Sequence, residues 1–124
     1  MAVTVTTQSS PLGTSLVQDT SANNTAANNT LGGNPVTIYM VEVDNTANGG
    51  AASYFKMANA ASAVVGTTAA DLVFMIPAGT KLSFAFPTGI VFSAGVSHWC
   101  VTAAAEAGAA SPGSAVVVRY VATV

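Results

Sequence analysis

Hydrophobic and polar residues alternate along much of the chain with a period of two, which is the pattern of a half-buried β-strand. The clearest case is Leu82, Phe84 and Phe86, which alternate with smaller or polar residues. The surrounding stretch, residues 71–95, has the pattern strand, turn, strand, turn, strand, because Pro and Gly residues divide it at two points. We therefore expect the hydrophobic core to form around this stretch.

The rest of the chain contains further short segments with strand character. They are residues 2–7, as an edge strand or an extended arm, and residues 36–43, 51–59, 96–102 and 115–124. Gly, Pro, Asn and Thr fill the connections, and Gly108 limits the one short Ala-rich run that favours a helix. This pattern predicts an all-β fold, a small antiparallel β-sandwich of jelly-roll type with seven or eight strands.

The strand expected at residues 36–43 has apolar residues on both of its faces. The alternation places Val36, Ile38 and Met40 on one face and Tyr39, Val41 and Val43 on the other. A strand of a sandwich is buried on both faces only when something covers its outer side. We therefore predict that the face bearing Tyr39, Val41 and Val43 lies in a subunit interface.

Residues 1–35 differ in composition from the rest of the chain. They are rich in Asn and Thr, which favour turns, and contain the near-repeat SANNT and AANNT. We expect an extended N-terminal arm at 1–35 and a sandwich domain at 36–124, with the arm docked on a neighbouring subunit or along its own domain. Removal of residues 1–34 is then expected to leave a folded domain. The large apolar residues of the arm are the predicted interface contacts, namely Leu12, Leu16, Val17 and Leu31.

The charge content limits the classes of partner. The chain has 124 residues, enough for one domain, and only 6 % of them are charged, against about 25 % in an average protein. We expect a surface rich in Ser, Thr and Asn together with surfaces covered by partners. Three Lys and Arg residues and a formal net charge of −2 predict no nucleic-acid partner. No signal peptide or membrane-spanning segment is expected either.

Residues that carry chemistry are few. His98 and Cys100 share one face of a predicted strand, but a zinc site needs three or four protein ligands, and a Cys–His pair needs a third, orienting group. We expect a buried His beside a buried thiol, no metal and no cofactor. Glu42 and Asp44 have the spacing of paired acids, yet acids at a strand end are usually solvated. No catalytic residue is predicted, so we expect no enzyme.

The aromatic residues allow one further alternative. A row of exposed rings on one sheet face would bind a sugar, and the candidates are Tyr39, Tyr54, Trp99 and Tyr120. Aromatic residues are also enriched in protein cores and interfaces, and we favour that interpretation.

Several segments between residues 43 and 97 resemble a family of small virion proteins of tailed bacteriophages. The matching segments are VDNTAN at 43–48, SYFKMANA at 53–60, VGTTAADLVFMIPAG at 65–79 and FPTGIVFSAGVS at 86–97, followed by a terminal strand, VVVRYV. The resemblance lies in the pattern of turns and strands. It implies a β-sandwich structural protein of a phage particle, and no functional residue carries over.

From this resemblance we expect a capsid decoration, or cement, protein on the exterior of the virion, made in the host cytoplasm. Its expected partners are the major capsid protein and further copies of itself, as trimers, because quasi-threefold sites recur on icosahedral shells. A tail, neck or baseplate component and a carbohydrate-binding module for host adsorption stay open as alternatives.

Overall fold

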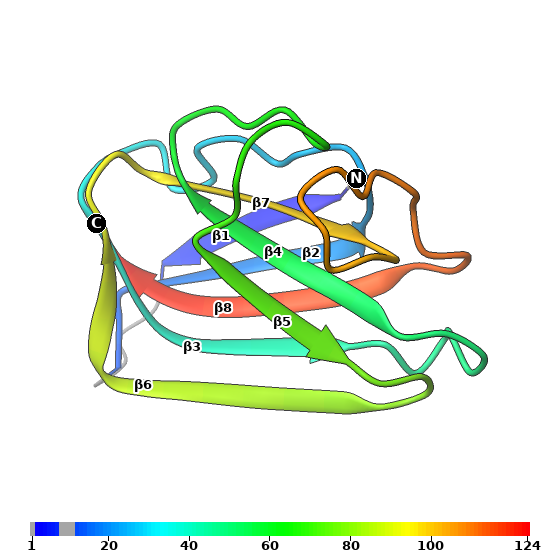
Figure 1. Cartoon of the computed structure of the whole chain (residues 1–124). Coiled ribbons are helices and arrows are strands. Elements are labelled where there is room, and N and C mark those ends of the chain that lie inside the picture. The colour runs from blue at the N-terminus through cyan, green and yellow to red at the C-terminus, as the bar shows by residue number, and fades with distance from the viewer. Residues whose placement is uncertain (1, 8–11) are drawn as a thin grey trace.

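A computed structural model describes residues 2–7 and 12–124, which form two antiparallel sheets packed face to face (Figure 1). The strands are β1 (Val3–Thr7), β2 (Ser15–Ala22), β3 (Val36–Asp44), β4 (Ser53–Asn59), β5 (Leu72–Ile76), β6 (Lys81–Phe92), β7 (Val96–Val101) and β8 (Val116–Thr123). The larger sheet has the order β1-β2-β8-β3-β6 and the smaller one β5-β4-β7. The predicted all-β sandwich is confirmed.

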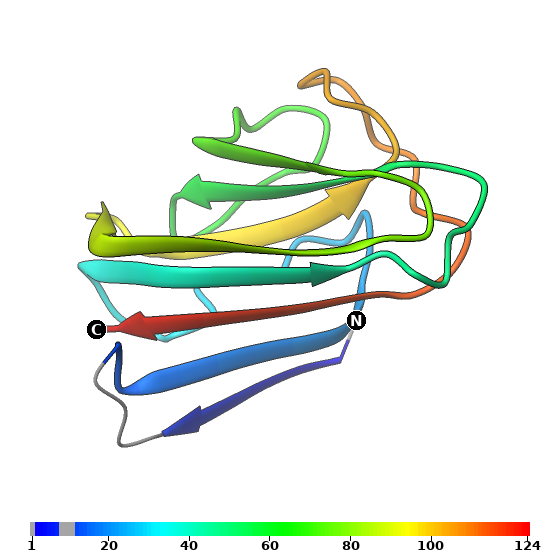
Figure 2. The same cartoon turned by 90° about the horizontal axis from the view of Figure 1, so that it is seen from below.

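The chain passes repeatedly from one sheet to the other, as in a jelly roll. After β2 it runs along the free edge of β7, where Asn23, Ala27 and Thr30 exchange backbone hydrogen bonds of 2.8–3.1 Å with that strand. It then returns to the larger sheet as β3, forms β4 and β5 in the smaller sheet, and alternates again through β6, β7 and β8. Figure 2 shows the five strands of the larger sheet in this order. Residues 23–30 thus take the place of a fourth strand in the smaller sheet.

The N-terminal segment is part of this sandwich, so the prediction of an extended arm and of a domain boundary at residue 35 is wrong. β1 pairs with β2, and β2 pairs with β8 from Ser15 to Asp19. The side chains of Val17 and Asp19 are fully buried inside the fold. Because removal of residues 1–34 would take both from the interior, the truncated chain should not keep this fold. The polar composition of the segment did not indicate a core strand, because the buried face of β2 includes the carboxylate of Asp19.

A β-bulge explains why β3 has apolar residues at both odd and even positions. Ile38 pairs with Ala122 and Met40 pairs with Val121, so Tyr39 is an extra residue opposite β8. A bulge of one residue shifts the alternation of side chains along a strand. The four inward residues are Val36 and Ile38 before the bulge and Val41 and Val43 after it, all fully buried in the core. The predicted two-sided apolar strand is therefore wrong: the inward face of β3 is apolar throughout, and its outward face mixes Met40 with polar residues such as Glu42 and Asp44.

The centre of the hydrophobic core does not lie in the middle of residues 71–95, where the sequence pattern predicted it. The largest side chains with less than 2 % exposure include Tyr120 and Phe55, which lie on β8 and β4. Phe84 and Phe86 of the edge strand β6 are only half-buried and pack against Phe74, with ring centroids 4.8 Å and 6.2 Å away. Because β6 is the last strand of its sheet, these rings close the margin of the sandwich instead of filling its centre.

A second irregularity lies opposite the bulge of β3. Residues 86–89 of β6 are inserted between the pairs Met40–Ala85 and Ile38–Ile90, and Gly89 has a φ of 78°. A Cβ atom at this glycine would collide with the methyl group of Thr37 and lie 3.1 Å from the ring of Tyr39. A positive φ and close neighbours together require glycine here.

Gly89→Ala should lower the free energy of unfolding by about 1–3 kcal/mol, because the new methyl group both clashes with Thr37 and occupies a strained φ. Gly49→Ala is the matched control, since its Cβ has no neighbour within 4 Å and its φ is ordinary. Urea unfolding followed by circular dichroism measures both variants. Equal stability of the two variants would contradict the role assigned to Gly89.

Candidate functional site

The only histidine of the chain is enclosed between the two sheets. The imidazole of His98, on β7, lies 2.8 Å from the carboxylate of Asp19 through Nε2 and 2.9 Å from the hydroxyl of Tyr120 through Nδ1. The Tyr120 hydroxyl lies 2.6 Å from Oγ1 of Thr30. Asp19, His98 and Tyr120 have no exposed surface. A continuous chain of hydrogen bonds therefore connects β2 and β8 of the larger sheet with β7 of the smaller one.

The hydrogen bonds around Asp19 indicate that it is a carboxylate. Burial alone raises its pKa, but the hydrogen bond from His98, the backbone N–H groups of Ser21 and Ala2 and the charge of His98 together bring the pKa below the ordinary value. An ionised Asp19 accepts from Nε2–H of His98. The other ring nitrogen, Nδ1, forms the second hydrogen bond of the imidazole, with the Tyr120 hydroxyl. Burial raises the pKa of Tyr120, which keeps its proton.

An acid, an imidazole and a hydroxyl in this order are also the groups of a hydrolase triad, but here all three are closed to solvent. Cys100, on the same face of β7, is buried as well, and burial, together with the charge of Asp19, raises the pKa of its thiol to about 12. A nucleophilic cysteine needs an accessible thiolate. The predicted arrangement of a buried His beside a buried thiol agrees with this geometry.

The other candidate groups are dispersed. Among residues 2–7 and 12–124 no three His, Cys, Asp or Glu side chains are grouped so that they could hold a metal ion. Glu42 and Asp44 lie on the outer side of the larger sheet, where Glu42 is 3.6 Å from Lys81 and 3.8 Å from Arg119. Hydrogen bonds from Thr46 lower the pKa of Asp44, so this carboxylate is not prepared as a general acid.

The four aromatic residues do not form a sugar-binding row. Trp99 is only 2 % exposed, Tyr120 is buried in the core, and Tyr39 and Tyr54 belong to different sheets. Trp99 lies in a small apolar cluster with Ala58, Ala63 and Val101 on the outer side of the smaller sheet, and its Nε1 has no hydrogen-bond partner.

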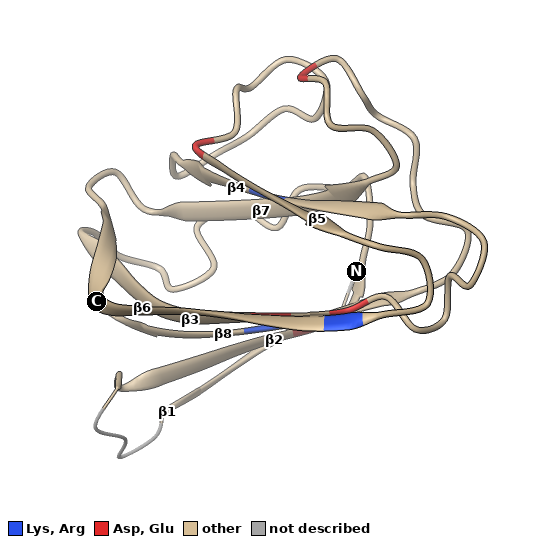
Figure 3. Ribbon diagram, turned by 60° about the horizontal axis from the view of Figure 1, so that its bottom comes forward, with Lys and Arg blue, Asp and Glu red and all other residues tan. Residues whose placement is uncertain are grey.

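The outer side of the smaller sheet is covered by loops of the chain itself. Figure 3 shows loops 60–71 and 102–115 above β4 and β7. Lys56 of β4 is 1 % exposed and donates from Nζ to the carbonyl of Ala105 at 2.8 Å. Val73 and Met75, on the edge strand β5, stay exposed.

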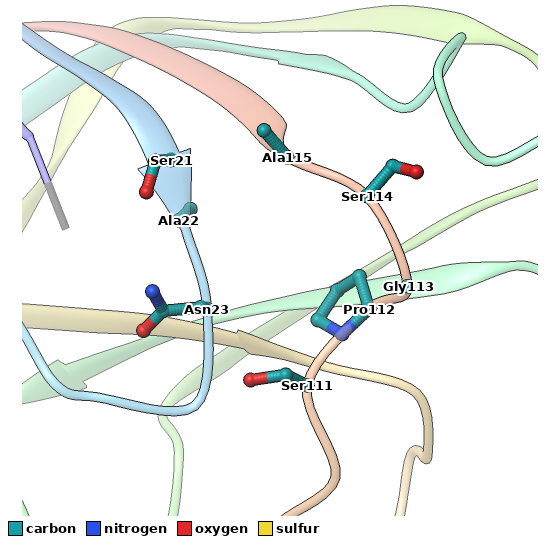
Figure 4. A pocket seen from close by; sticks show the side chains of 8 residues that line it. All are labelled: Ser21, Ala22, Asn23, Ser111, Pro112, Gly113, Ser114 and Ala115. Carbon is teal, nitrogen blue, oxygen red and sulfur yellow. The ribbon is translucent and has the colours of Figure 1, made fainter.

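A shallow pocket of about 270 Å³ lies where β2 ends beside the loop before β8. In Figure 4, Ser21 and Asn23 line one wall and Ser111 and Pro112 the other. No charged or aromatic side chain lines it, whereas ligand pockets usually combine an apolar lining with a few precisely placed polar groups. The pocket therefore indicates no particular ligand.

A second buried polar cluster fixes the loops at one end of the sandwich. The side-chain amide of Asn45 donates towards the carbonyls of Ala51, Ile76 and Pro77 at 3.1–3.3 Å. Its oxygen accepts from Asn48 and Ser53. Asn48 also donates to the carbonyl of Ser114 and accepts from its backbone N–H, so this cluster connects the β3–β4 loop with the β5–β6 turn and with loop 102–115.

The predicted interface residues are divided between the core and the surface. Val17, Val41 and Val43 are completely buried in the core, so they offer no surface to a partner and their assignment to an interface is wrong. Leu31 is half-buried against the core and Leu12 is exposed. Leu16 and Tyr39 are half-buried, and Leu16 lies on the outer side of the larger sheet.

Sequence reasoning missed the rest of this outer face. One row across the sheet is Leu16, Val121, Met40 and Ala85, and the next is Gln18, Arg119, Glu42 and Ser83. The outward positions alternate with the core residues of β8 and β3, so the period of two in the sequence could have identified the residues of this outer face. The unrecognised bulge at Tyr39 concealed it, because it changes which residues of β3 face outward.

No family model matches the chain, and no curated protein or solved structure is significantly similar to it. The resemblance to phage virion proteins therefore stays a prediction. The part of the chain that the structure describes contains no helix long and apolar enough to cross a membrane.

Asp19→Asn should lower the free energy of unfolding at neutral pH by about 1–3 kcal/mol, because it removes a buried charge from a satisfied network. The pKa of Asp19 is lowered in the folded state, so its contribution is complete above the unfolded value of about 3.9 and is lost as the pH falls through the folded pKa. The variant should lose this acid-dependent part of its stability.

Thermal unfolding across the acid range measures the effect, with Asp44→Asn as the control. Asp44 also has a lowered pKa, but Thr46 lowers it in an exposed turn, so its replacement should change neutral stability little. A pH profile of Asp19→Asn identical to that of the unmodified chain would contradict the assigned charge state.

Cys100 should react with iodoacetamide at least about a hundredfold more slowly in the folded chain than in urea, because the thiol is buried and its pKa is raised. Ala104→Cys adds a thiol at an exposed position and is the control. Mass spectrometry of the folded variant should show one rapid label. Two rapid labels would show that Cys100 is accessible.

Proposed function

We propose that this chain is a non-enzymatic structural protein of a phage virion, a decoration protein that binds the outside of the assembled capsid and stabilises it. The observation that supports a structural role most directly is the position of the only histidine, His98, and the only cysteine, Cys100. Both are closed to solvent between the sheets, and the hydrogen bonds of His98 connect those sheets. The groups best suited to catalysis therefore stabilise the fold.

The class of particle is inferred from the resemblance of residues 43–97 and from composition. Jelly rolls occur in viral capsid proteins, but also in lectins and cupins, so the fold alone does not identify a function. The dispersal of Tyr39, Tyr54, Trp99 and Tyr120 removes the aromatic row that motivated the carbohydrate-binding alternative. A tail, neck or baseplate component shares both fold and composition and is separated from the decoration role by experiment.

The proposed mechanism is thermodynamic linkage. A protein that binds the assembled shell and not the free capsid protein stabilises the shell by the free energy of its binding. A low charge content suits this role, because large surfaces can be buried without the desolvation cost of unpaired ions. The major capsid protein is the proposed partner, and the capsid exterior is the proposed location.

Virions from which this protein has been deleted should release their DNA at a lower temperature than complete virions, because the linkage term is lost. Heating both particles with a dye that fluoresces on free DNA measures the release. Adding the purified chain back should restore the original temperature. Unchanged shells with impaired adsorption to the host would instead assign the chain to the tail.

A further inference from the structure

Among the described residues, loops cover the outer face of the larger sheet less than they cover that of the smaller sheet. The smaller sheet is shielded on its outer side by loops 60–71 and 102–115, whereas the described segments below β3, β6 and β8 in Figure 3 are β2 and β1, which belong to the same sheet. This face combines an apolar row and a charged row that lie next to each other across the strands. The charged row is the more exposed of the two, because Arg119 and Ser83 are exposed whereas Val121 is only 7 % exposed and Leu16 and Met40 are half-buried. A partner of this face must therefore satisfy the charged row first.

The charges of this face balance each other. Two acids, Glu42 and Asp44, and two bases, Lys81 and Arg119, lie on β3, β6 and β8 (Figure 3). Arg119 and Glu42 are direct neighbours across the boundary between β8 and β3, while Asp44 and Lys81 lie at the strand ends. The boundary between β8 and β3 is the midline of the face, with the positive Arg119 on one side and the negative Glu42 on the other. When a second copy is turned over onto this face, its negative charge can lie opposite the positive charge of the first.

We propose that two copies of this chain pack face to face through the larger sheet, around a two-fold axis that runs along the strands between β8 and β3. This axis places β8 of each copy opposite β3 of the other. Arg119 then lies opposite the partner's Glu42, Val121 opposite the partner's Met40, and Leu16 opposite the partner's Ala85. Every contact occurs twice, as an interface between identical copies requires.

The charges disfavour a face-to-face arrangement around an axis that follows the charged row. A two-fold axis across the strands, along the charged row, would place each Arg119 opposite its own copy and each Glu42 opposite its own copy. Like charges in contact repel each other and suppress wrong pairings. Both axes keep the strands of the two copies aligned, as packed sheets do to within about 30°, so the charges are what distinguishes the two arrangements.

The size of the face agrees with a stable dimer. Five strands spaced by about 4.8 Å, with about eight residues of 3.3 Å each, give a flat area of about 600 Å². Protruding side chains increase the accessible area above this value. A standard interface buries about 800 Å² on each partner, so nearly the whole outer face is needed.

Sedimentation velocity on the purified full chain should show a dimer at micromolar concentration. Arg119→Glu gives a face with two acids beside the midline and Glu42→Arg gives one with two bases, so each variant alone should dissociate with a constant raised about tenfold or more. Val73→Glu, on exposed β5 of the other sheet, is the control and should stay dimeric.

Mixing the two variants is the decisive measurement. The Arg119→Glu chain and the Glu42→Arg chain should form a heterodimer, because an acidic face meets a basic one. Within each variant the residues at 42 and 119 still have like charges, so only contacts between copies can explain recovery on mixing. Circular dichroism of each variant verifies that it is folded before mixing.

A monomer or a trimer of the unmodified chain, or the absence of a heterodimer after mixing two folded variants, would overturn the proposal. The proposed dimer differs from the trimer expected from capsid symmetry, and the same measurement distinguishes the two. The test uses the isolated chain and does not depend on the proposed virion role. Dimerisation and shell stabilisation can therefore fail separately.

Discussion

The hydrogen-bonded chain Asp19–His98–Tyr120 is the constraint on which the rest of the sandwich depends. It connects three strands that are distant in the sequence, because Tyr120 is 22 positions and Asp19 is 79 positions from His98. All three side chains are buried. Leaving one partner of such a buried hydrogen bond unsatisfied costs about 1–3 kcal/mol, a substantial part of the 5–15 kcal/mol that stabilises a typical domain. A slip of β2 by one residue would turn Asp19 outward and leave His98 without its acceptor, so the network also specifies register.

This network explains why the polar N-terminal segment belongs to the fold. The segment after β2 contributes Thr30 to the same chain of hydrogen bonds and covers the edge of β7 with backbone bonds. Asn and Thr residues, which suggested an arm, satisfy polar groups along an irregular edge instead. An open edge of β7 would expose unpaired backbone groups beside the buried His98.

Strand positions were predictable because the period of two and the Gly and Pro turns are local signals. The faces of β3 were not, because the bulge at Tyr39 is set by pairing with β8 and changes the alternation midway. His98 and Cys100 were correctly placed on one face of β7. The partner of His98 was not predictable, since Asp19 meets it only after both sheets have formed. Long-range pairing is thus the information that the local pattern lacks.

The scarcity of charge has a structural explanation that does not require every surface to meet a partner. Asp19 is buried in the hydrogen-bonded network with His98, and Lys56 is covered by the 102–115 loop. Four of the remaining charges lie together on the outer face of the larger sheet, where they sum to zero. Balanced charges beside an apolar row add little attraction by themselves, but they penalise misaligned partners. Low overall charge and a specific interaction face are therefore compatible in the same small fold.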